Sequence, residues 1–230
     1  PEEAEREADD LHRAMVKVSK ELEKAGETRG VAKRAALQMR NEMKVFLEEQ
    51  VPLMLLICNP GIRDRHWKQI EQITLLTLNN TQHATLAQMV DAGLHHHVAA
   101  IEETCVAASK ENTLELGMDK MEVEWSQMLF SLKAHRNSGT YILSGIDEIQ
   151  QLLDDHIVKA QAMASSRFIK PFIERITVWS KTLDDLQEIL DNWLKMQATW
   201  LYLEPIFSSD DIMRQMPKEG KLFKAVDNIW

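Results

Sequence analysis

Apolar residues recur at helical spacing along most of this chain, and the most regular pattern lies just before residue 205. The residues there follow one another at steps of one and three, which is the period of an α-helix with one broad buried face. Gln197 is the only polar member of this row. The row comprises Leu183, Leu186, Ile189, Leu190, Trp193, Leu194, Gln197, Trp200 and Leu201.

A proline follows this pattern and predicts where the helix ends. Pro205 lacks an N–H group and disfavours helical geometry at Glu204, so we expect the helix to end near Leu203. Residues 208–210, Ser-Ser-Asp, offer side-chain acceptors that can cap a new helix. We therefore predict a structural joint of fixed angle, with its aromatic side chains buried. Its residues are Trp193, Trp200, Tyr202, Glu204, Pro205, Phe207 and Asp211.

The remaining chain predicts further helices. The first 25 residues carry a heptad seam, which favours a helix in a bundle over the alternative of a coiled coil. Its members are Ala4, Ala8, Leu11, Met15, Val18, Leu22 and Ala25. Gly26 and Gly30 bracket a loop. Helices are then expected over about 31–50, with Val51-Pro52 as a kink or restart, and over 62–73, 85–109, 114–124 and 147–163. A polar loop begins at Asn79-Asn80, and Lys170-Pro171 opens the long helix.

One segment changes to a period of two. Met128, Phe130 and Leu132 alternate with other residues before a turn-rich stretch, and Tyr141 and Leu143 do so after it. This pattern predicts a β-hairpin over about 125–144. The predicted fold class is therefore mainly α, an elongated multi-helix bundle with one β-hairpin. We expect a helical segment over 1–40, a larger bundle over 41–230, and a longer parent polypeptide.

Composition narrows the classes of function. The formal net charge is −9 and the pI is about 5.4, which argues against binding to nucleic acid or to an anionic membrane surface. The longest apolar run, Val51 to Cys58, is too short to span a bilayer. Two cysteines in apolar settings, Cys58 and Cys105, predict buried reduced thiols in an intracellular protein.

Three groups of polar residues invite a catalytic or metal-binding interpretation, and each has a simpler one. His95, His96 and His97 are adjacent, whereas ligands on a helix need a spacing of three or four. Residues 154–156, Asp-Asp-His, favour a solvated carboxylate pair beside a partly buried histidine. Residues 63–66, Arg-Asp-Arg-His, favour a surface network anchored by Trp67. The phosphate-binding, serine-nucleophile, zinc-hydrolase and CxxC motifs do not occur, so we predict no catalytic, metal or cofactor site.

Four stretches resemble the linker region of dynein heavy chains, in that family's order and spacing. They are NPGIRDRHW at 59–67, GTYILSGIDEIQQLLDDH at 139–156, FIKPF at 168–172 and QATWLYLEPIFSSDDIMRQMPKEGKLF at 197–223. The resemblance covers about residues 40–230. Pro205 in YLEPIF and the first stretch are more similar to axonemal than to cytoplasmic heavy chains. The residues that carry the first stretch's likeness are Asn59, Pro60, Gly61, Arg65, His66 and Trp67.

The resemblance implies a role without chemistry in this segment. Dynein heavy chains are minus-end-directed microtubule motors, driven by a ring of AAA+ modules that binds ATP and Mg²⁺ outside these residues. The linker is a helical rod that lies across the ring and transmits force to the tail. Implied partners are the ring itself, the tail with its intermediate and light chains, and microtubules. The implied location is the cytoplasm and cytoskeleton, in the axoneme of a cilium or flagellum. Two alternatives remain: a free-standing helical scaffold that binds a partner through its seams, and a helical enzyme using Asp154, Asp155 and the histidines.

Overall fold

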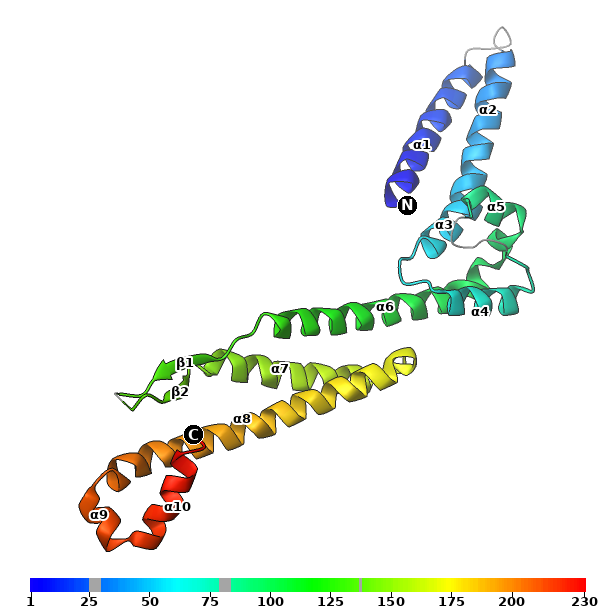
Figure 1. The fold of residues 1–230 in the computed structure, drawn as a ribbon. Helices are drawn as coiled ribbons and strands as arrows, with labels where there is room; N and C mark the ends of the chain where they lie inside the picture. Colours follow the sequence, from blue (N-terminus) through cyan, green and yellow to red (C-terminus); the bar gives the residue numbers. More distant parts are fainter. Residues whose placement is uncertain (25–29, 79–83, 137) are drawn as a thin grey trace. The chain divides into compact units, whose positions relative to one another are not determined.

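A computed structural model describes residues 1–24, 30–78, 84–136 and 138–230, and its elements are drawn in Figure 1. The chain forms two compact units, Pro1–Thr113 and Leu114–Trp230. The predicted loops at Gly26 and Asn79-Asn80 lie outside the described residues. The structure is mainly α-helical with a single two-stranded sheet in its described part, which confirms the predicted fold class. The division at residue 40 stays a prediction.

The first unit begins with two helices that lie side by side, α1 (Glu2–Lys24) and α2 (Gly30–Val45). Their seam differs from the predicted heptad row, because Leu11 and Val18 are exposed while Ser19 is fully buried. Arg40 Nη1 donates to Ser19 Oγ at 3.5 Å across the seam. Small seam residues such as Ala8 and Ser19 let the helix backbones approach closely, and a straight α-helix drifts from a seven-residue repeat.

The predicted break at Val51-Pro52 is a restart within one helical run. A single π-helical turn, Phe46–Gln50, follows α2, and α3 (Val51–Ile57) then starts with Pro52 in its first turn. Val51 N still donates to Phe46 O of the π-helical turn, so the run loses only the one hydrogen bond that Pro52 cannot donate. The apolar stretch of α3 enters the core of the first unit with Leu53, which is fully buried.

Three further helices complete the first unit's core: α4 (Asp64–Thr74), α5 (Leu86–Asp91) and the first part of α6 (Val98–Ser126). A short 3₁₀ helix, Leu94–His97, joins α5 to α6. The core of this unit is formed by Leu53, Ile70, Leu78, Met89, Leu94, Ile101 and Cys105.

The helix bounds predicted for 85–124 are wrong in two ways. Gly93 adopts a left-handed φ of 84° and ends the first helix well before Ser109. Conversely, the expected gap before Leu114 does not exist, because α6 continues from Val98 to Ser126. Thr113 Oγ donates to the carbonyl of Ser109 one turn back, so this polar residue is accommodated within the helix.

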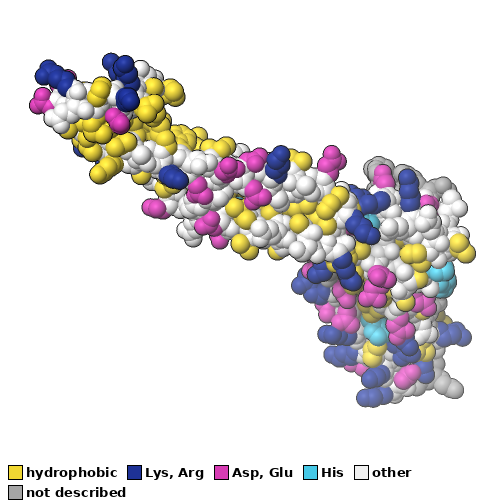
Figure 2. Space-filling view, turned by 90° about the horizontal axis from the view of Figure 1, so that it is seen from below, with side chains coloured by type: hydrophobic (Ala, Val, Ile, Leu, Met, Phe, Trp, Pro, Cys, Tyr) yellow, Lys and Arg dark blue, Asp and Glu magenta, His cyan; other side chains and the backbone are white. Residues whose placement is uncertain are grey.

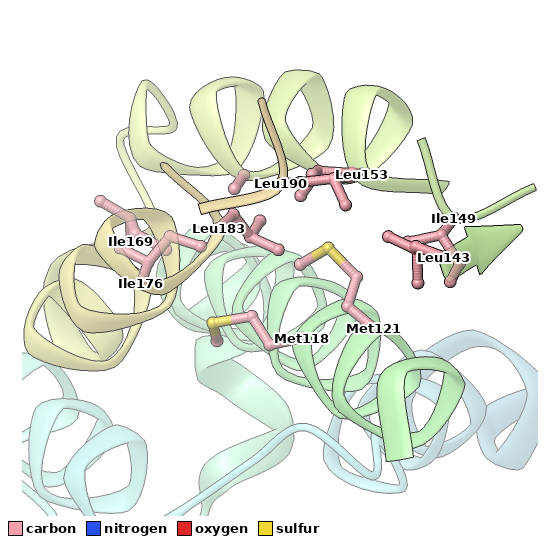
Figure 3. Close-up of a cluster of buried hydrophobic side chains, with 10 residues drawn as sticks. Met118, Met121, Leu143, Ile149, Leu153, Ile169, Ile176, Leu183 and Leu190 are labelled. Atoms are coloured by element: carbon pink, nitrogen blue, oxygen red, sulfur yellow. The ribbon is translucent and has the colours of Figure 1, made fainter. Parts of the chain in front are cut away.

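The second unit is built on two long helices that lie side by side, α7 (Asp147–Ala164) and α8 (Ile173–Phe207). Pro171, which was expected in the first turn of the long helix, lies in a 3₁₀ turn, Lys170–Phe172, directly before α8. The last part of α6 packs on both helices through Met118 and Met121 (Figure 3). The buried cluster comprises Met118, Met121, Leu143, Ile149, Leu153, Ala160, Ile169, Ile176, Leu183 and Leu190.

The predicted β-hairpin exists but is shorter than expected. β1 (Ser131–Ala134) pairs antiparallel with β2 (Tyr141–Ser144), with Leu132 opposite Leu143. Trp125 and Ser126, which were expected in the hairpin, belong to α6 instead. The turn uses left-handed φ angles at Arg136 and Gly139. Asn137, part of the predicted turn, lies outside the described residues.

The chain ends in a hook formed by the last turns of α8, by α9 (Asp210–Gln215) and by α10 (Pro217–Asp227). α10 packs back against α8. The prediction of two buried cysteines is half wrong. Cys105 is buried, and burial raises the pKa of its thiol to about 11, but Cys58 is exposed at the end of α3. Within the described residues, none of the helices has the length and apolar character to cross a membrane.

Candidate functional site: two helix joints

The first joint closes α8, but at a later residue than the sequence predicts. Pro205 lies inside α8, which continues to Phe207. Proline removes only the one hydrogen bond that its own N–H would donate, and the helix closes downstream, where Ser208 N donates to Glu204 O at 3.0 Å. The predicted cap is also different. Ser209 takes the N-cap position of α9 without a side-chain hydrogen bond, and Ser208 Oγ bonds back to Glu204 O.

Trp200 is the centre of this joint. It is only 3% exposed, and its Nε1 donates to Asp227 Oδ1 of α10 at 3.0 Å. Its ring stacks on Trp230 with centroids 5.6 Å apart, and His135 of the hairpin turn meets it edge-on at 5.1 Å. A single side chain therefore holds α8, α10 and the hairpin together.

Some of the other predicted joint residues make contacts within the joint, and some do not. Phe207 stacks on Phe223 of α10 at 5.2 Å, and partly buried Trp193 contacts Phe130 at 5.9 Å. Tyr202 is 70% exposed, so its predicted burial is wrong. Ile189 of the predicted apolar row is likewise exposed. Asp211 lies on the surface of α9, 3.8 Å from Arg214. Ile189 and Tyr202 both lie at the edge of the buried stripe of α8, which is narrower than the spacing of its apolar residues suggests.

Glu204 ties the hairpin turn to the end of α8. Arg136 Nη1 donates to Glu204 Oε2 at 3.2 Å, and His135 Nε2 lies 3.6 Å from the same oxygen. The sequence pattern marks neither His135 nor Arg136 as part of the joint. The turn formers at 135–139 were the only available signal, and they locate a turn without its docking partner.

Gln197 makes a further contact between the hairpin and α8. Its Nε2 donates to Leu143 O at 3.0 Å, and its Oε1 accepts from Leu143 N at 2.7 Å. Leu143 faces Leu132 at a position where the backbone groups of β2 point away from β1. The side-chain amide therefore satisfies both backbone groups at the outer edge of the sheet.

An apolar groove lies between α8 and α10 in the hook. Its volume is about 740 Å³. Figure 2 shows hydrophobic side chains gathered in this region, at the left end of the view. The groove is lined by Asn192, Lys195, Met196, Thr199, Trp200, Leu203, Phe207, Glu219, Leu222, Phe223 and Val226.

The second joint is the corner between α3 and α4, which contains the motif at 59–67. Asn59 Nδ2 donates to Cys105 O at 2.8 Å and to Ser109 Oγ at 2.7 Å, while Asn59 Oδ1 accepts from Gly61 N at 2.9 Å. The side chain thus closes its own turn and attaches it to α6. Pro60 is exposed, and Trp67 packs partly buried against the first unit's core.

The predicted surface network at 63–66 is wrong, because His66 is almost fully buried. Its Nδ1 accepts from Arg63 N at 3.0 Å, and its Nε2 lies 3.0 Å from Glu111 Oε2 of α6. Arg65 also donates to this carboxylate, with its Nε at 3.0 Å. One glutamate of α6 therefore holds two consecutive residues of α4.

Gly61 is expected to be intolerant of any side chain. A Cβ at this position would lie 2.4 Å from Ala108 O and 2.7 Å from Asn112 Cβ, both in α6. Gly61→Ala should therefore destabilise the first unit by about 1–3 kcal/mol through overpacking. Urea unfolding followed by circular dichroism measures this. Gly30→Ala is the matched control, because a Cβ there meets nothing within 4 Å, and equal midpoints for both variants would contradict the close approach.

A second buried histidine repeats the arrangement in the other unit. His156 is fully buried in α7, not partly buried as predicted. Its Nδ1 accepts from Trp125 Nε1 at 3.0 Å, so its proton belongs on Nε2, which lies 2.9 Å from Glu124 Oε2. Burial lowers the pKa of both His66 and His156, more than Glu111 and Glu124 raise it. The hydrogen bonds that His66 Nδ1 accepts from Arg63 N and His156 Nδ1 accepts from Trp125 Nε1 both need a neutral imidazole.

These two histidines predict acid sensitivity. The unfolded chain protonates them near pH 6.5, whereas the folded state resists protonation. Below that pH the unfolded state binds more protons, so the free energy of unfolding falls as pH falls. We expect the urea midpoint to be constant above about pH 6.5 and to drop as the pH falls below it. His66→Gln with His156→Gln should flatten this dependence, while His96→Gln, an exposed control, should leave it unchanged.

The described residues contain no group of three or more side chains placed to hold a metal ion. In the group at residues 154–156, Asp154 accepts a hydrogen bond from Gln150, whereas His156 is buried. The three adjacent histidines lie in the 3₁₀ turn before α6, with His95 and His96 rings 3.7 Å apart. In both joints the side chains pack against one another and form hydrogen bonds to backbone groups.

Comparison with known proteins decides the family. The family model described as "Dynein heavy chain, N-terminal region 2" matches residues 1–230. The chain belongs to the dynein heavy chain family. This dynein segment is 44% identical to dynein axonemal heavy chain 3 of Mus musculus over 198 residues, which is 86% of the chain and 5% of that relative. It is 41% identical to dynein axonemal heavy chain 12 of Homo sapiens over 216 residues, which is 94% of the chain and 7% of that relative.

The relatives confirm the predicted resemblance to axonemal heavy chains. Dynein axonemal heavy chain 1 of Mus musculus is a third such relative, 41% identical over 195 residues, which is 85% of the chain. The chain spans only a small part of these curated relatives, between 5% and 7% of their lengths. It corresponds to their N-terminal region.

Proposed function

We propose that this dynein segment is a force-transmitting linker of an axonemal dynein, a minus-end-directed microtubule motor of cilia and flagella. The ATPase ring, with its ATP and Mg²⁺, lies outside residues 1–230, and the segment itself has no catalytic role. Its partners are the AAA+ ring of the same polypeptide, the tail with its intermediate and light chains, and microtubules through the whole motor. It acts in the cytoplasm and cytoskeleton, within the axoneme.

The observation that carries this proposal is the continuous support of α8. The helix has 35 residues, which corresponds to a length of roughly 52 Å at 1.5 Å per residue. Buried residues recur every seven positions along it, at Ile176, Leu183, Leu190 and Gln197. Near its start, Arg175 bonds Asp119 at 2.7 Å and Glu122 at 3.1 Å on α6. A lever transmits force only if it does not bend between its attachments, and this helix is braced from end to end.

The joint at the end of α8 supplies the test. In a whole heavy chain we expect Pro205→Gly to slow microtubule gliding while leaving basal ATPase activity nearly unchanged. The reason is that glycine loosens the last turn without touching any catalytic group. Tyr202→Ala, an exposed residue of the same helix, is the control and should glide normally. Equal loss of gliding and ATPase in Pro205→Gly would count against a mechanical role.

The alternative is a free-standing helical scaffold that binds a partner through its seams. The exposed apolar residues of α1 are the observation in its favour. The two functions differ in a simple property of the gene. A linker must continue in the same reading frame into an AAA+ module with a phosphate-binding loop, whereas a scaffold need not. A stop codon directly after Trp230 would exclude the linker.

A further inference from the structure

The apolar groove of the hook is open to solvent between two helix faces. On α8, the residues that line it follow one another at steps of four, three and four: Asn192, Met196, Thr199 and Leu203. On α10, Leu222 and Val226 lie four positions apart, and they are 71% and 43% exposed. Each wall is therefore one face of a helix, with side chains spaced as a third helix packed against it requires.

The lining of the groove indicates a helix rather than a small polar ligand. Small-molecule sites combine apolar walls with a few polar groups that converge on the ligand. Among the described residues that line the groove, Thr199 carries the only hydroxyl, and it donates to Lys195 O of its own helix. The charged side chains of Lys195 and Glu219 lie on opposite walls and are exposed. Between Asn192 and Phe207 the α8 wall is roughly 22 Å long, which is about four helical turns.

The position of Trp230 indicates which helix fills the groove. Trp230 stacks on Trp200, which lines the groove, so residues that follow Trp230 start next to it. The chain matches an N-terminal region of dynein heavy chains and spans only 5–7% of the lengths of its relatives, so those proteins continue far beyond the matching residues. A segment tethered beside a site has an effective concentration of the order of millimolar, which favours it over a free partner.

We propose that the groove between α8 and α10 is filled by a helix from the segment of the same polypeptide that follows Trp230. The apolar side chains of that helix pack on Met196, Leu203, Leu222 and Val226, and the hook becomes a three-helix unit. The groove is then the place where the second unit is joined to the rest of the heavy chain. The inference rests on one premise of the proposed function, that the polypeptide continues after Trp230, and does not depend on the transmission of force.

Hydrogen exchange of the α10 amides tests this proposal in three proteins. They are the 230-residue chain, the same chain extended by about 60 residues of the parent sequence, which is enough for two helices and their connections, and the parent heavy chain. We expect α10 to be protected about tenfold or more better in both longer proteins, because the hook opens only after the added helix leaves the groove. Equal protection in the 230-residue and extended chains overturns the proposal. Protection that rises only in the parent heavy chain also overturns it, because a more distant part of the polypeptide would then cover the groove.

A double substitution tests whether the groove itself is responsible. Leu222→Gln with Val226→Gln should lower α10 protection by less than about threefold in the 230-residue chain, where both side chains are exposed. In the extended chain, where the added helix buries them, the loss should be about tenfold or more. Val158→Gln with Val178→Gln is the matched control, because these exposed valines of the second unit do not line the groove. Equal losses from the two double variants in the extended chain would contradict docking in the groove.

Sedimentation of the extended chain distinguishes a tethered helix from a second copy. We expect a monomer, and a dimer that Leu222→Gln with Val226→Gln abolishes would place a second copy in the groove and overturn the proposal. Failure of this inference is distinguishable from failure of the proposed function. The exchange experiments measure docking in the absence of load, whereas gliding by the Pro205→Gly heavy chain measures the transmission of force.

Discussion

Replacing Trp200 with alanine should destabilise the second unit by about 3–5 kcal/mol. The indole is almost fully buried and lines the groove between α8 and α10, so its removal enlarges that groove. It also leaves Asp227 Oδ1 without its donor, and it removes the faces on which Trp230 and His135 pack. Three elements lose their common contact at once. We therefore expect the hook to detach from α8 before the rest of the unit unfolds.

Urea unfolding followed by circular dichroism measures the loss, and hydrogen exchange of α10 amides locates it. Trp200→Phe separates the two contributions, because phenylalanine restores most of the buried area but not the bond to Asp227. It should recover more than half of the stability. Tyr202→Ala is the matched control on the same helix and should shift the midpoint by less than about 0.5 kcal/mol. An unchanged midpoint for Trp200→Ala would mean that the indole is not a core anchor.

Helix type and the buried row of α8 could be predicted from sequence because both follow from local periodicity. The bounds could not, and the errors have identifiable causes. Pro205 was expected to stop α8, but it removes only one hydrogen bond from the helix, and the helix continues to Phe207, which stacks on Phe223 of α10. The apolar pattern predicts a helix that continues past Gly93. In the structure the helix ends there, because Gly93 adopts a left-handed φ, which the apolar pattern does not indicate.

The joints themselves depend on contacts between residues far apart in sequence. Glu111 holds His66, and Glu204 holds Arg136. No local sequence pattern links such pairs. Whether a side chain is exposed also depends on residues far away in the sequence. Leu11 and Val18 look like seam residues, yet both lie beside a seam that small residues have shifted, and Tyr202 is exposed although we expected it to be buried. The motif at 59–67 was recognisable by resemblance, while its physical reason, a turn attached to α6 by Asn59, required the structure.

Gln197 is the residue where sequence and structure differ most usefully, and replacing it should have the second largest effect. It occupies a heptad position of α8 at which Ile176, Leu183 and Leu190 are apolar. The difference is what it faces. The earlier residues face helix side chains, whereas Gln197 faces the backbone edge of β2 and satisfies both the N–H and the C=O of Leu143.

Gln197→Met keeps the size of the side chain and removes both hydrogen bonds. Each buried backbone group left without a partner costs about 1–3 kcal/mol, so we expect a loss of about 2–4 kcal/mol, allowing for partial access of water to the hairpin. The Leu143 amide should also exchange faster with solvent. Gln187→Met is the control on the same helix, because Gln187 bonds only the side chains of Gln150 and Asp191.

A third substitution separates the two backbone groups. Gln197→Glu keeps an acceptor for Leu143 N–H but offers no donor to Leu143 O at neutral pH, and it places a carboxylate beside that carbonyl oxygen. Acidification protonates the carboxylate and restores a donor, so this variant should gain stability relative to Gln197→Met as pH falls. If both variants keep the midpoint of the unaltered chain at every pH, the edge of β2 does not need the amide, and Leu143 packing, the His135–Trp200 contact and the Arg136–Glu204 pair are enough to hold the hairpin to α8.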